Sequence, residues 1–264
     1  MRTSKQDTGY SAICTSDATS ITVRGRDLCE DLIGKVDFSS YFWLLVTGQE
    51  PDENQSFFLN ATLVALAEHG MVPSVAAARM TLAAAPEAVQ GAVAAGILGC
   101  GSVALGSAEI AGRFYAECVA DQRETGDPVD QVAVRNIERW RQHTKAVPGF
   151  GHWQHVEGDP RALRLLELAD ERGASGEHVA MVRALQAALP ETIGRDLPVN
   201  VNGPIPAILL DIGWPLAALK GIGLLSRTGS LIGHLAEEAE RPVGFIMSGA
   251  ASAAIEYDGK PSNS

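Results

Sequence analysis

The sequence predicts an all-α fold whose helices are joined by short connections. Apolar residues recur at helical spacing along most of the 264 residues, whereas segments that alternate every second residue are scarce. Several helical segments begin at a capping residue or proline and close on glycine. The best strand candidate is residues 18–28, "ATSITVRGRDL". No fixed-period repeat or long linker is present, so any second lobe would be inserted within the helical body.

The first half of the chain contains three helix-forming regions. The segment "DENQSFFLNATLVALAEHG" has acidic residues after Pro51 and closes on Gly70, which suits the helix dipole and a glycine stop. The segment "PSVAAARMTLAAA" can begin at a Ser74 cap. Residues 86–120 are rich in alanine and glycine, so helices there can pack with their backbones close together.

The second half predicts further helices in "VDQVAVRNIERWRQHTK", "DPRALRLLELADERG" and "SGEHVAMVRALQAALP". In the second of these, Asp159 and Pro160 are typical of a cap and a first helical residue. Its apolar stripe comprises Leu163, Leu165, Leu166 and Leu168. The mainly apolar residues 204–242 then predict more helix.

Composition and charge argue against several classes of protein. The net charge of −11 disfavours a nucleic-acid partner, because phosphate binding needs clustered cations. No apolar run reaches the length of a membrane span, and the N-terminal segment lacks the apolar core of a secretory signal. We therefore expect a cytoplasmic protein without membrane contact. The four scattered cysteines form no CxxC pair, so we expect reduced thiols, no metal site and no tightly bound cofactor.

The segment "VPGFGHWQHVEGDPR", residues 147–161, concentrates groups that can do chemistry. Its glycines allow the backbone to approach a ligand closely, and His152 stands at the edge of the corner. Arg161 comes at a helix start, where a cation gains nothing from the dipole, so a bidentate carboxylate partner explains it better. A surface turn with a solvated arginine fits the local pattern equally well.

Other polar residues leave alternatives open. His69 closes a predicted helix, where an imidazolium can offset the dipole. Arg227 lies in an apolar helix and needs a partner, either a substrate carboxylate or a buried ion pair. Nucleophile-elbow, P-loop and dinucleotide motifs are absent from the sequence. Local chemistry predicts a helical protein that binds a small carboxylate-bearing ligand. The remaining histidines suggest solvated or satisfied groups: His143, His155, His178 and His234.

The segment "VPGFGHWQHVEGDPRA" resembles the "GFGH…DPR" signature of the citrate synthase family, with the same spacing from His152 to Arg161. Four further segments resemble that family in the same order along the chain: "VRGRDLCEDLIGKVDFSSYFWLLVTGQEP", "LVALAEHGMVPSVAAAR", "LPVNVNGPIPAILLDIGWP" and "SRTGSLIGHLAEEAERP". The short length and the "EHG" and "NVNG" forms are similar to the citryl-CoA lyase branch, which includes the cleavage module of ATP-citrate lyase.

The resemblance implies a citrate-synthase-like, all-α architecture. A large helical domain with dimer contacts would span residues 1–110 and 223–264, and a small inserted lobe, residues 111–222, would contribute to the CoA and substrate site. It also implies a homo-oligomer, a dimer or tetramer, that closes over a CoA thioester and a small oxo acid such as oxaloacetate. Coenzyme A would then be part of the substrate.

The resemblance also assigns roles to individual residues. His69 and His152 would hydrogen-bond the oxo acid or citryl group. Arg161 and Arg227 would clamp its carboxylates, and Arg241 would reach the partner subunit's site. The backbone of the corner would lie along the CoA moiety at Val147, Gly149, Phe150 and Gly151.

Three positions depart from the family pattern. Asn202 stands where the family has an aspartate that moves a proton at the methyl carbon of the thioester, and an amide cannot act as that base. Ala104 replaces a histidine of citrate synthases, a loss that the lyase module shares. Trp153 replaces the arginine that commonly follows the signature histidine.

The resulting prediction is a carbon–carbon lyase. It would cleave citryl-CoA, or a related 3-hydroxy-3-carboxyacyl-CoA, to acetyl-CoA and a 2-oxo acid, or run the reverse condensation. The catalytic positions would be His69, His152 and Asn202, with His155 or an ordered water as the proton donor to carbon. Two alternatives stay open: a non-catalytic acyl-CoA-binding protein without its aspartate, and an enzyme whose Asn202 donates to another thioester.

Overall fold

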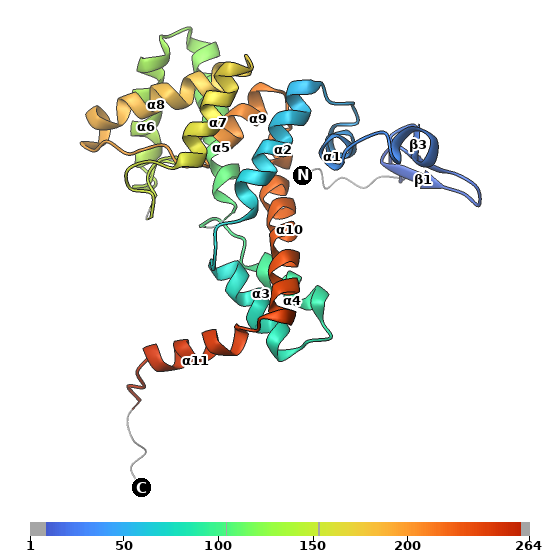
Figure 1. Cartoon of the computed structure of the whole chain (residues 1–264). Helices are drawn as coiled ribbons and strands as arrows, with labels where there is room; N and C mark the ends of the chain where they lie inside the picture. The colour runs from blue at the N-terminus through green and yellow to red at the C-terminus, as the bar shows by residue number, and fades with distance from the viewer. Residues whose placement is uncertain (1–8, 104, 153, 260–264) are drawn as a thin grey trace.

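The computed structural model describes residues 9–103, 105–152 and 154–259, and helices dominate it (Figure 1). The all-α prediction is confirmed. The strands are short and form one antiparallel sheet, in which β2 (Ile21–Val23) pairs with β1 (Cys14–Ser16) and with β3 (Arg26–Asp27). The strand candidate at residues 18–28 thus contains two strands. They are separated by a turn whose residues Arg24 and Gly25 have φ of 51° and 82°.

The helices follow in chain order with short connections. They are a π-helical turn η1 (Leu28–Leu32), α1 (Phe38–Thr47), α2 (Glu53–Ala67), α3 (Pro73–Ala84), α4 (Val89–Leu98), α5 (Ser107–Thr125), α6 (Val129–Arg141), α7 (Pro160–Glu171), α8 (Glu177–Ile193), α9 (Pro204–Asp211), a 3₁₀ turn η2 (Leu216–Ala218), α10 (Leu219–Glu240) and α11 (Gly244–Ala254).

Helix starts follow the predicted capping chemistry in part. Asp159 caps α7, and Pro160 is its first residue, as predicted. The predicted Ser74 cap is wrong, because α3 already begins at Pro73, whose ring fixes φ for a first helical position. In the stripe of α7, Leu165 is buried, but Leu163 is 53% exposed.

Two hydrophobic cores share the long helix α10 (Figure 1). The larger core joins α2 to α5–α9 and the start of α10, around fully buried side chains such as Phe58 and Tyr115. The smaller core lies between α3, α4 and the second half of α10. With 22 residues, α10 is about 33 Å long and passes along both cores.

The two predicted domain boundaries fall within helices. The boundary at residues 110/111 lies in α5, and the one at residues 222/223 lies in α10. The larger core also includes Trp43 and Phe58, which belong to the predicted large domain. The division into two lobes therefore stays a prediction.

Close packing of α4 against α10 predicts opposite effects for two glycines of α4. Gly96→Ala should lower the free energy of unfolding by about 1–3 kcal/mol, as overpacking does. Its Cβ would lie 2.6 Å from Leu231 Cδ1 and 2.7 Å from the Ser74 carbonyl oxygen. The matched control Gly91→Ala has its nearest neighbour at 3.6 Å and should raise that free energy by about 0.4–1 kcal/mol. Urea unfolding measures the free energy of unfolding of both variants. Equal changes in the two would contradict the close packing of α4 against α10 at Gly96.

Candidate active site

The corner at residues 147–152 is bonded to the loop at residues 198–203. Phe150 and Val199 form an antiparallel bridge, Gly151 N donates to Pro198 O at 2.8 Å, and Asn200 N donates to Gly149 O at 2.9 Å. Gly149 has a φ of 88°, and a Cβ there would collide with the Tyr115 hydroxyl. The two loops, far apart in sequence, are thus joined by hydrogen bonds into one unit. Its close packing against Tyr115 requires glycine at position 149.

The four residues predicted to follow CoA occupy this corner. The side chains of Val147 and Phe150 are buried in the larger core. Gly149 and Gly151 have no side chains, so these four residues can offer a ligand only their backbone. That CoA lies there stays a prediction.

A buried carboxylate, Asp159, joins the loop at residues 198–203 to the start of α7. Its Oδ1 accepts from Arg161 N at 3.1 Å and Nε at 3.0 Å, and its Oδ2 accepts from Arg161 Nη2 at 2.8 Å and Val201 N at 3.0 Å. Burial alone would raise the pKa of Asp159, but the hydrogen bonds and charge of Arg161 lower it below the usual value. Asp159 is therefore ionised and acts as an acceptor for its neighbours.

Arg161 has the bidentate carboxylate partner that the sequence predicted, but that partner is Asp159 of the same chain. The edge of the guanidinium formed by Nε and Nη2 is therefore fixed. The solvated-arginine alternative is wrong, because Arg161 is paired and its side chain is only 23% exposed. No hydrogen bond of its Nη1 is recorded among the described residues, so a role in ligand binding stays a prediction.

Arg227 is a buried cation, 4% exposed, on α10. Within the described part of the chain it forms no ion pair, so the buried-ion-pair alternative finds no partner there. Its Nε is buried without a hydrogen-bond partner, and its other contacts, to Ser230 Oγ and Leu66 O, are long at 3.4 and 3.5 Å. Burial lowers its pKa overall; the charges of Glu68 and Cys100 oppose this, and the charge of Arg161 adds to it. Such a group is suited to an incoming anion.

Three imidazoles meet beside these arginines. The ring centroids of His152 and His155 are 4.7 Å apart and stacked, and those of His69 and His152 are 5.9 Å apart. His152 Nδ1 accepts the N–H groups of Gln154 and His155, so the proton of neutral His152 lies on Nε2. Burial and then the charge of Arg161 lower the pKa of His69, and burial and then His155 lower that of His152. Both are neutral at pH 7.

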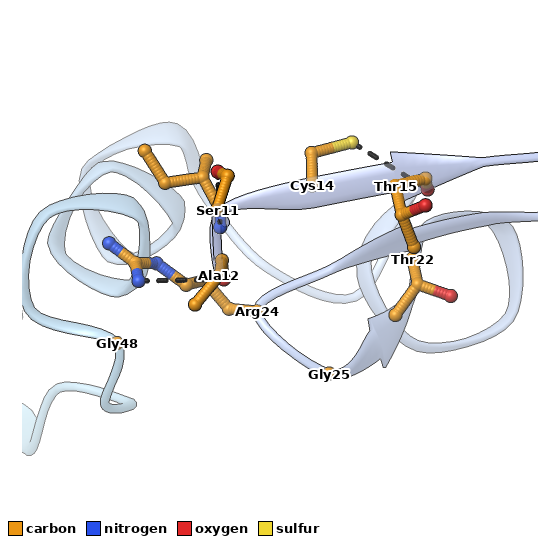
Figure 2. A pocket seen from close by; sticks show the side chains of 9 residues that line it. Ser11, Ala12, Cys14, Thr15, Thr22, Arg24, Gly25 and Gly48 are labelled. Atoms are coloured by element: carbon orange, nitrogen blue, oxygen red, sulfur yellow. Dashed lines mark hydrogen bonds between the residues drawn. The ribbon is translucent and has the colours of Figure 1, made fainter. Parts of the chain in front are cut away.

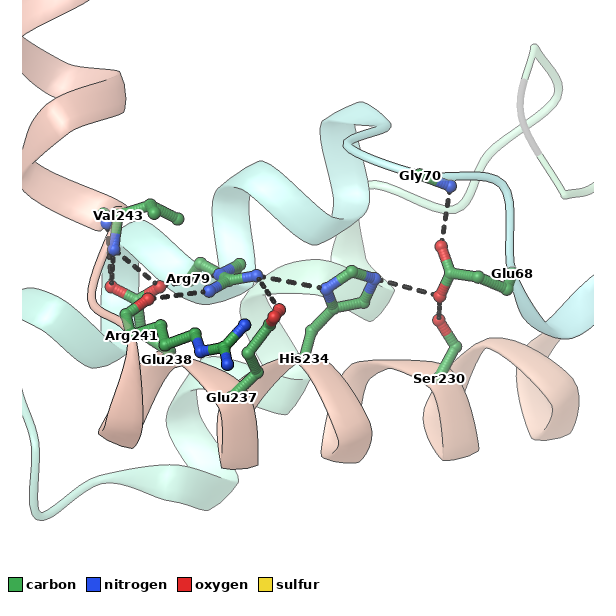
Figure 3. Close-up of polar contacts among 10 residues, drawn as sticks. Glu68, Gly70, Arg79, Ser230, His234, Glu237, Glu238, Arg241 and Val243 are labelled. Carbon is green, nitrogen blue, oxygen red and sulfur yellow. Dashed lines mark hydrogen bonds and ion pairs between the residues drawn. The ribbon is translucent and has the colours of Figure 1, made fainter.

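His69 lies outside α2, which ends at Ala67, so the helix-dipole explanation for it is wrong. Glu68 fixes its turn by accepting from His69 N at 2.9 Å and Gly70 N at 2.6 Å (Figure 3). Burial would raise the pKa of Glu68, but hydrogen bonds from Ser230 and Gly70 lower it overall. His69 is therefore held by an ionised carboxylate.

A polar chain continues from Glu68 along α10 (Figure 3). His234 Nε2 lies 2.9 Å from Glu68 Oε2, and its Nδ1 lies 3.4 Å from Arg79 Nη1. Arg79 pairs with Glu238 at 2.6 Å, with both side chains 2% exposed. Helix α3 and the second half of α10 are thus connected to the turn of His69 by polar contacts.

The structure places the remaining predicted residues differently. Asn202 follows Val201 on the loop, and its backbone N donates to Asn200 Oδ1 at 2.9 Å. Arg241 ends α10, about 21 Å along that helix from Arg227, so it is not brought to this chain's own cluster. Ala104 and Trp153 lie outside the described residues.

The sequence does not predict the site roles of Asp159 and His234, which it indicates only as a helix cap and as a solvated or satisfied group. It leaves His155 open, as a solvated or satisfied histidine or as a proton donor to carbon. The available signals were the spacing of three from His152 to His155 and the position of Glu68 immediately before His69. Neither signal reveals a contact between segments distant in sequence.

Metal sites and cavities elsewhere add little. Over the ranges that the structure describes, no group of three His, Cys, Asp or Glu side chains is placed to hold a metal ion, and no helix could cross a membrane. A cavity of about 450 Å³ lies beside the sheet (Figure 2). Its charged residue Arg24 already donates to Leu45 O and Ala12 O.

Comparisons with known proteins concern the family and the fold. A family model described as "Citrate synthase, C-terminal domain" matches residues 18–244. Citrate synthase from Synechocystis sp. is 26% identical over 204 residues, which cover 68% of this chain and 48% of that protein. The chain thus spans about half the length of this curated relative.

Two solved structures extend the comparison. Citryl-CoA lyase from Hydrogenobacter thermophilus superimposes with a TM-score of 0.85 and 28% identity, covering 97% of this chain and 96% of that one. ATP citrate lyase from Methanothrix soehngenii, solved in complex with citrate and coenzyme A, has a TM-score of 0.76 at 20% identity and covers 98% and 43%. The second likeness concerns the fold alone.

Replacing Asp159 with asparagine should loosen the site. An amide cannot accept from all the donors that meet there, so Asp159→Asn should cost about 1.5–3 kcal/mol of unfolding free energy at pH 7. The pKa of Asp159 is lower in the folded state than in the unfolded state. The extra stability of the parent over the variant is therefore fully present above the unfolded pKa of about 3.9, and it is lost as pH falls through the lower folded pKa. Urea unfolding at pH 7 and below pH 4 measures it. The exposed Asp258→Asn is the control, and an equal effect there would contradict the role of Asp159.

Proposed function

Because this chain belongs to the citrate synthase family, we propose that it is a citryl-CoA lyase-like enzyme. It cleaves citryl-CoA, or a related 3-hydroxy-3-carboxyacyl-CoA, to acetyl-CoA and a 2-oxo acid such as oxaloacetate, or catalyses the reverse condensation. Support comes from the likeness to citryl-CoA lyase, which extends over nearly the full length of both chains.

Arg227 is the observation that carries this proposal. A buried guanidinium with an orphaned Nε and no ion pair among the described residues needs an anion, and a substrate carboxylate supplies it. Arg161, fixed in orientation by Asp159, is near enough for its charge to act on Arg227. Two adjacent arginines suit a ligand with more than one carboxylate, as citryl-CoA and oxaloacetate have.

The histidines supply the chemistry of cleavage. The bond between the hydroxyl-bearing carbon and the thioester α-carbon breaks, and its electrons form the thioester enolate. The hydroxyl loses its proton and becomes the carbonyl of the oxo acid, and the enolate carbon gains a proton. His152, protonated on Nε2, donates to a substrate oxygen, and His69 lies near enough to both arginines for their charges to lower its pKa. The non-catalytic alternative draws no support from a site that keeps these groups together.

The proposal includes a CoA thioester along the backbone of the 147–151 corner and a homo-oligomer. Large apolar side chains are exposed on α4, on the second half of α10 and on α11. These segments lie at the end of the molecule where α10 finishes (Figure 1). Among them Leu98 is 87% and Phe245 72% exposed, and such surfaces commonly mark protein interfaces. The proposal also places the protein in the cytoplasm, where CoA thioesters and oxo acids occur together.

Incubation with citryl-CoA tests the proposed activity. The protein should release acetyl-CoA and oxaloacetate, measured by chromatography of the CoA products. Arg227→Leu should weaken oxaloacetate binding in calorimetry by about 10–150-fold, the equivalent of about 1.5–3 kcal/mol. The control Arg113→Leu changes an exposed arginine of α5 and should bind like the parent. A parent that neither cleaves citryl-CoA nor condenses acetyl-CoA with oxaloacetate would refute the proposal. CoA binding without turnover would favour the non-catalytic alternative.

Self-association tests the proposed interface. The parent should sediment as a dimer or tetramer at micromolar concentration, and Ile232→Glu on α10 should shift it toward monomer by placing a charge on the apolar surface. Leu163→Glu is the matched control, because Leu163 is similarly exposed on α7 away from that surface. A parent that sediments only as a monomer, or equal effects of the two variants, would contradict the proposed surface.

A further inference from the structure

His155 is joined to the site by a direct contact between two rings. Its Nε2 lies 3.2 Å from Nε2 of His69, with ring centroids 5.4 Å apart and the planes perpendicular at 89°. It also stacks on His152. Since one ring must donate and the other accept, His69 and His155 share a single proton at this contact.

The other titratable groups around the site are already engaged. The oxygens of Asp159 accept from Arg161 and Val201, and those of Glu68 accept from Ser230, His234 and two backbone N–H groups. The Tyr115 hydroxyl is buried and donates to Pro148 O, and its burial raises its pKa far above the usual value. His152 Nδ1 accepts two backbone N–H groups. Among the described residues, the His69–His155 pair is therefore best placed to gain and lose a proton.

We propose that His69 and His155 act as one acid–base pair in the cleavage, with His155 acting through His69. This rests on the proposed function. The pair takes the proton of the tertiary hydroxyl as the carbon–carbon bond breaks, and it returns a proton to the α-carbon of the thioester enolate. One proton is taken and one is returned, so citryl-CoA yields acetyl-CoA and oxaloacetate without any further reactant.

The surroundings of the pair suit this task. Burial, Arg161, His155 and Arg227 lower the pKa of His69, and only Asp159 opposes them. Neutral His69 is therefore favoured at neutral pH and can accept a proton. A protonated pair is in turn a strong donor, and the N···N contact spreads its charge over two rings. The pair thus performs the proton transfer at the thioester α-carbon, for which the amide of Asn202 is not basic enough.

Two substitutions separate proton transfer from positioning. In His155→Gln the side-chain amide reaches about as far as Nε2 and keeps a hydrogen bond to His69, but it cannot carry a proton. His155→Ala removes both functions. We expect either variant to lower kcat for citryl-CoA cleavage, and deuterium exchange at the methyl group of acetyl-CoA, about 100-fold or more, with KM little changed.

His143→Gln, at an exposed histidine beyond α6, is the control and should behave like the parent. If His155→Gln retains the parent's kcat while His155→Ala loses it, His155 only positions His69 and the acid–base proposal is wrong. If both variants retain it, His155 has no part in the reaction.

NMR titration of labelled histidine rings tests the pair without turnover. Replacing His155 with glutamine removes a neighbouring charge that lowers the pKa of His69, so the His69 midpoint should rise in His155→Gln. An unchanged midpoint would overturn the pair, whatever the activity. The parent could also prove inactive on citryl-CoA while the His69 midpoint still rises in His155→Gln. That result would refute the proposed reaction but support the pair as a proton-sharing unit.

Discussion

The site depends on one buried interaction, the carboxylate of Asp159. It caps α7, orients the guanidinium of Arg161 and accepts from the backbone of Val201, so the start of α7 and the loop at residues 198–203 meet on two oxygen atoms. Because a buried charge without partners is costly, the carboxylate holds these two segments in one arrangement. The loop carries Asn202 and is itself bonded to the corner that presents His152, so Asp159 acts on that corner through the loop.

Helix α10 connects this arrangement to the rest of the molecule. It carries Arg227 into the site, supplies His234 to Glu68, and forms the buried pair of Glu238 with Arg79. A displacement of α10 would therefore change the turn of His69 and the position of Arg227 together. The same helix also bears part of the exposed apolar surface proposed for self-association, so subunit contact and site geometry share one element.

The site is positively charged, whereas the chain as a whole is negatively charged. The whole sequence carries a net charge of −11, yet the cluster combines two arginines with neutral histidines, and its nearest carboxylates are committed to hydrogen bonds. An anionic substrate is thus attracted only where positive charge is concentrated and buried. Beside two arginines, a proton acceptor that is neutral before the reaction is favoured, and imidazole is such a group.

The sequence alone determined the helical class, the Asp159–Pro160 helix start and the family, since the resemblance of five ordered motifs is confirmed by the match over residues 18–244. These follow from local spacing and composition, which depend on neighbours along the chain. Only the tertiary structure decided that Arg161 pairs with Asp159, that Arg227 is buried without an ion pair among the described residues, and that His155 contacts His69. These features depend on tertiary packing. Each requires distant segments to come together, or a side chain to fold back on its neighbour, and local sequence patterns do not reveal such contacts.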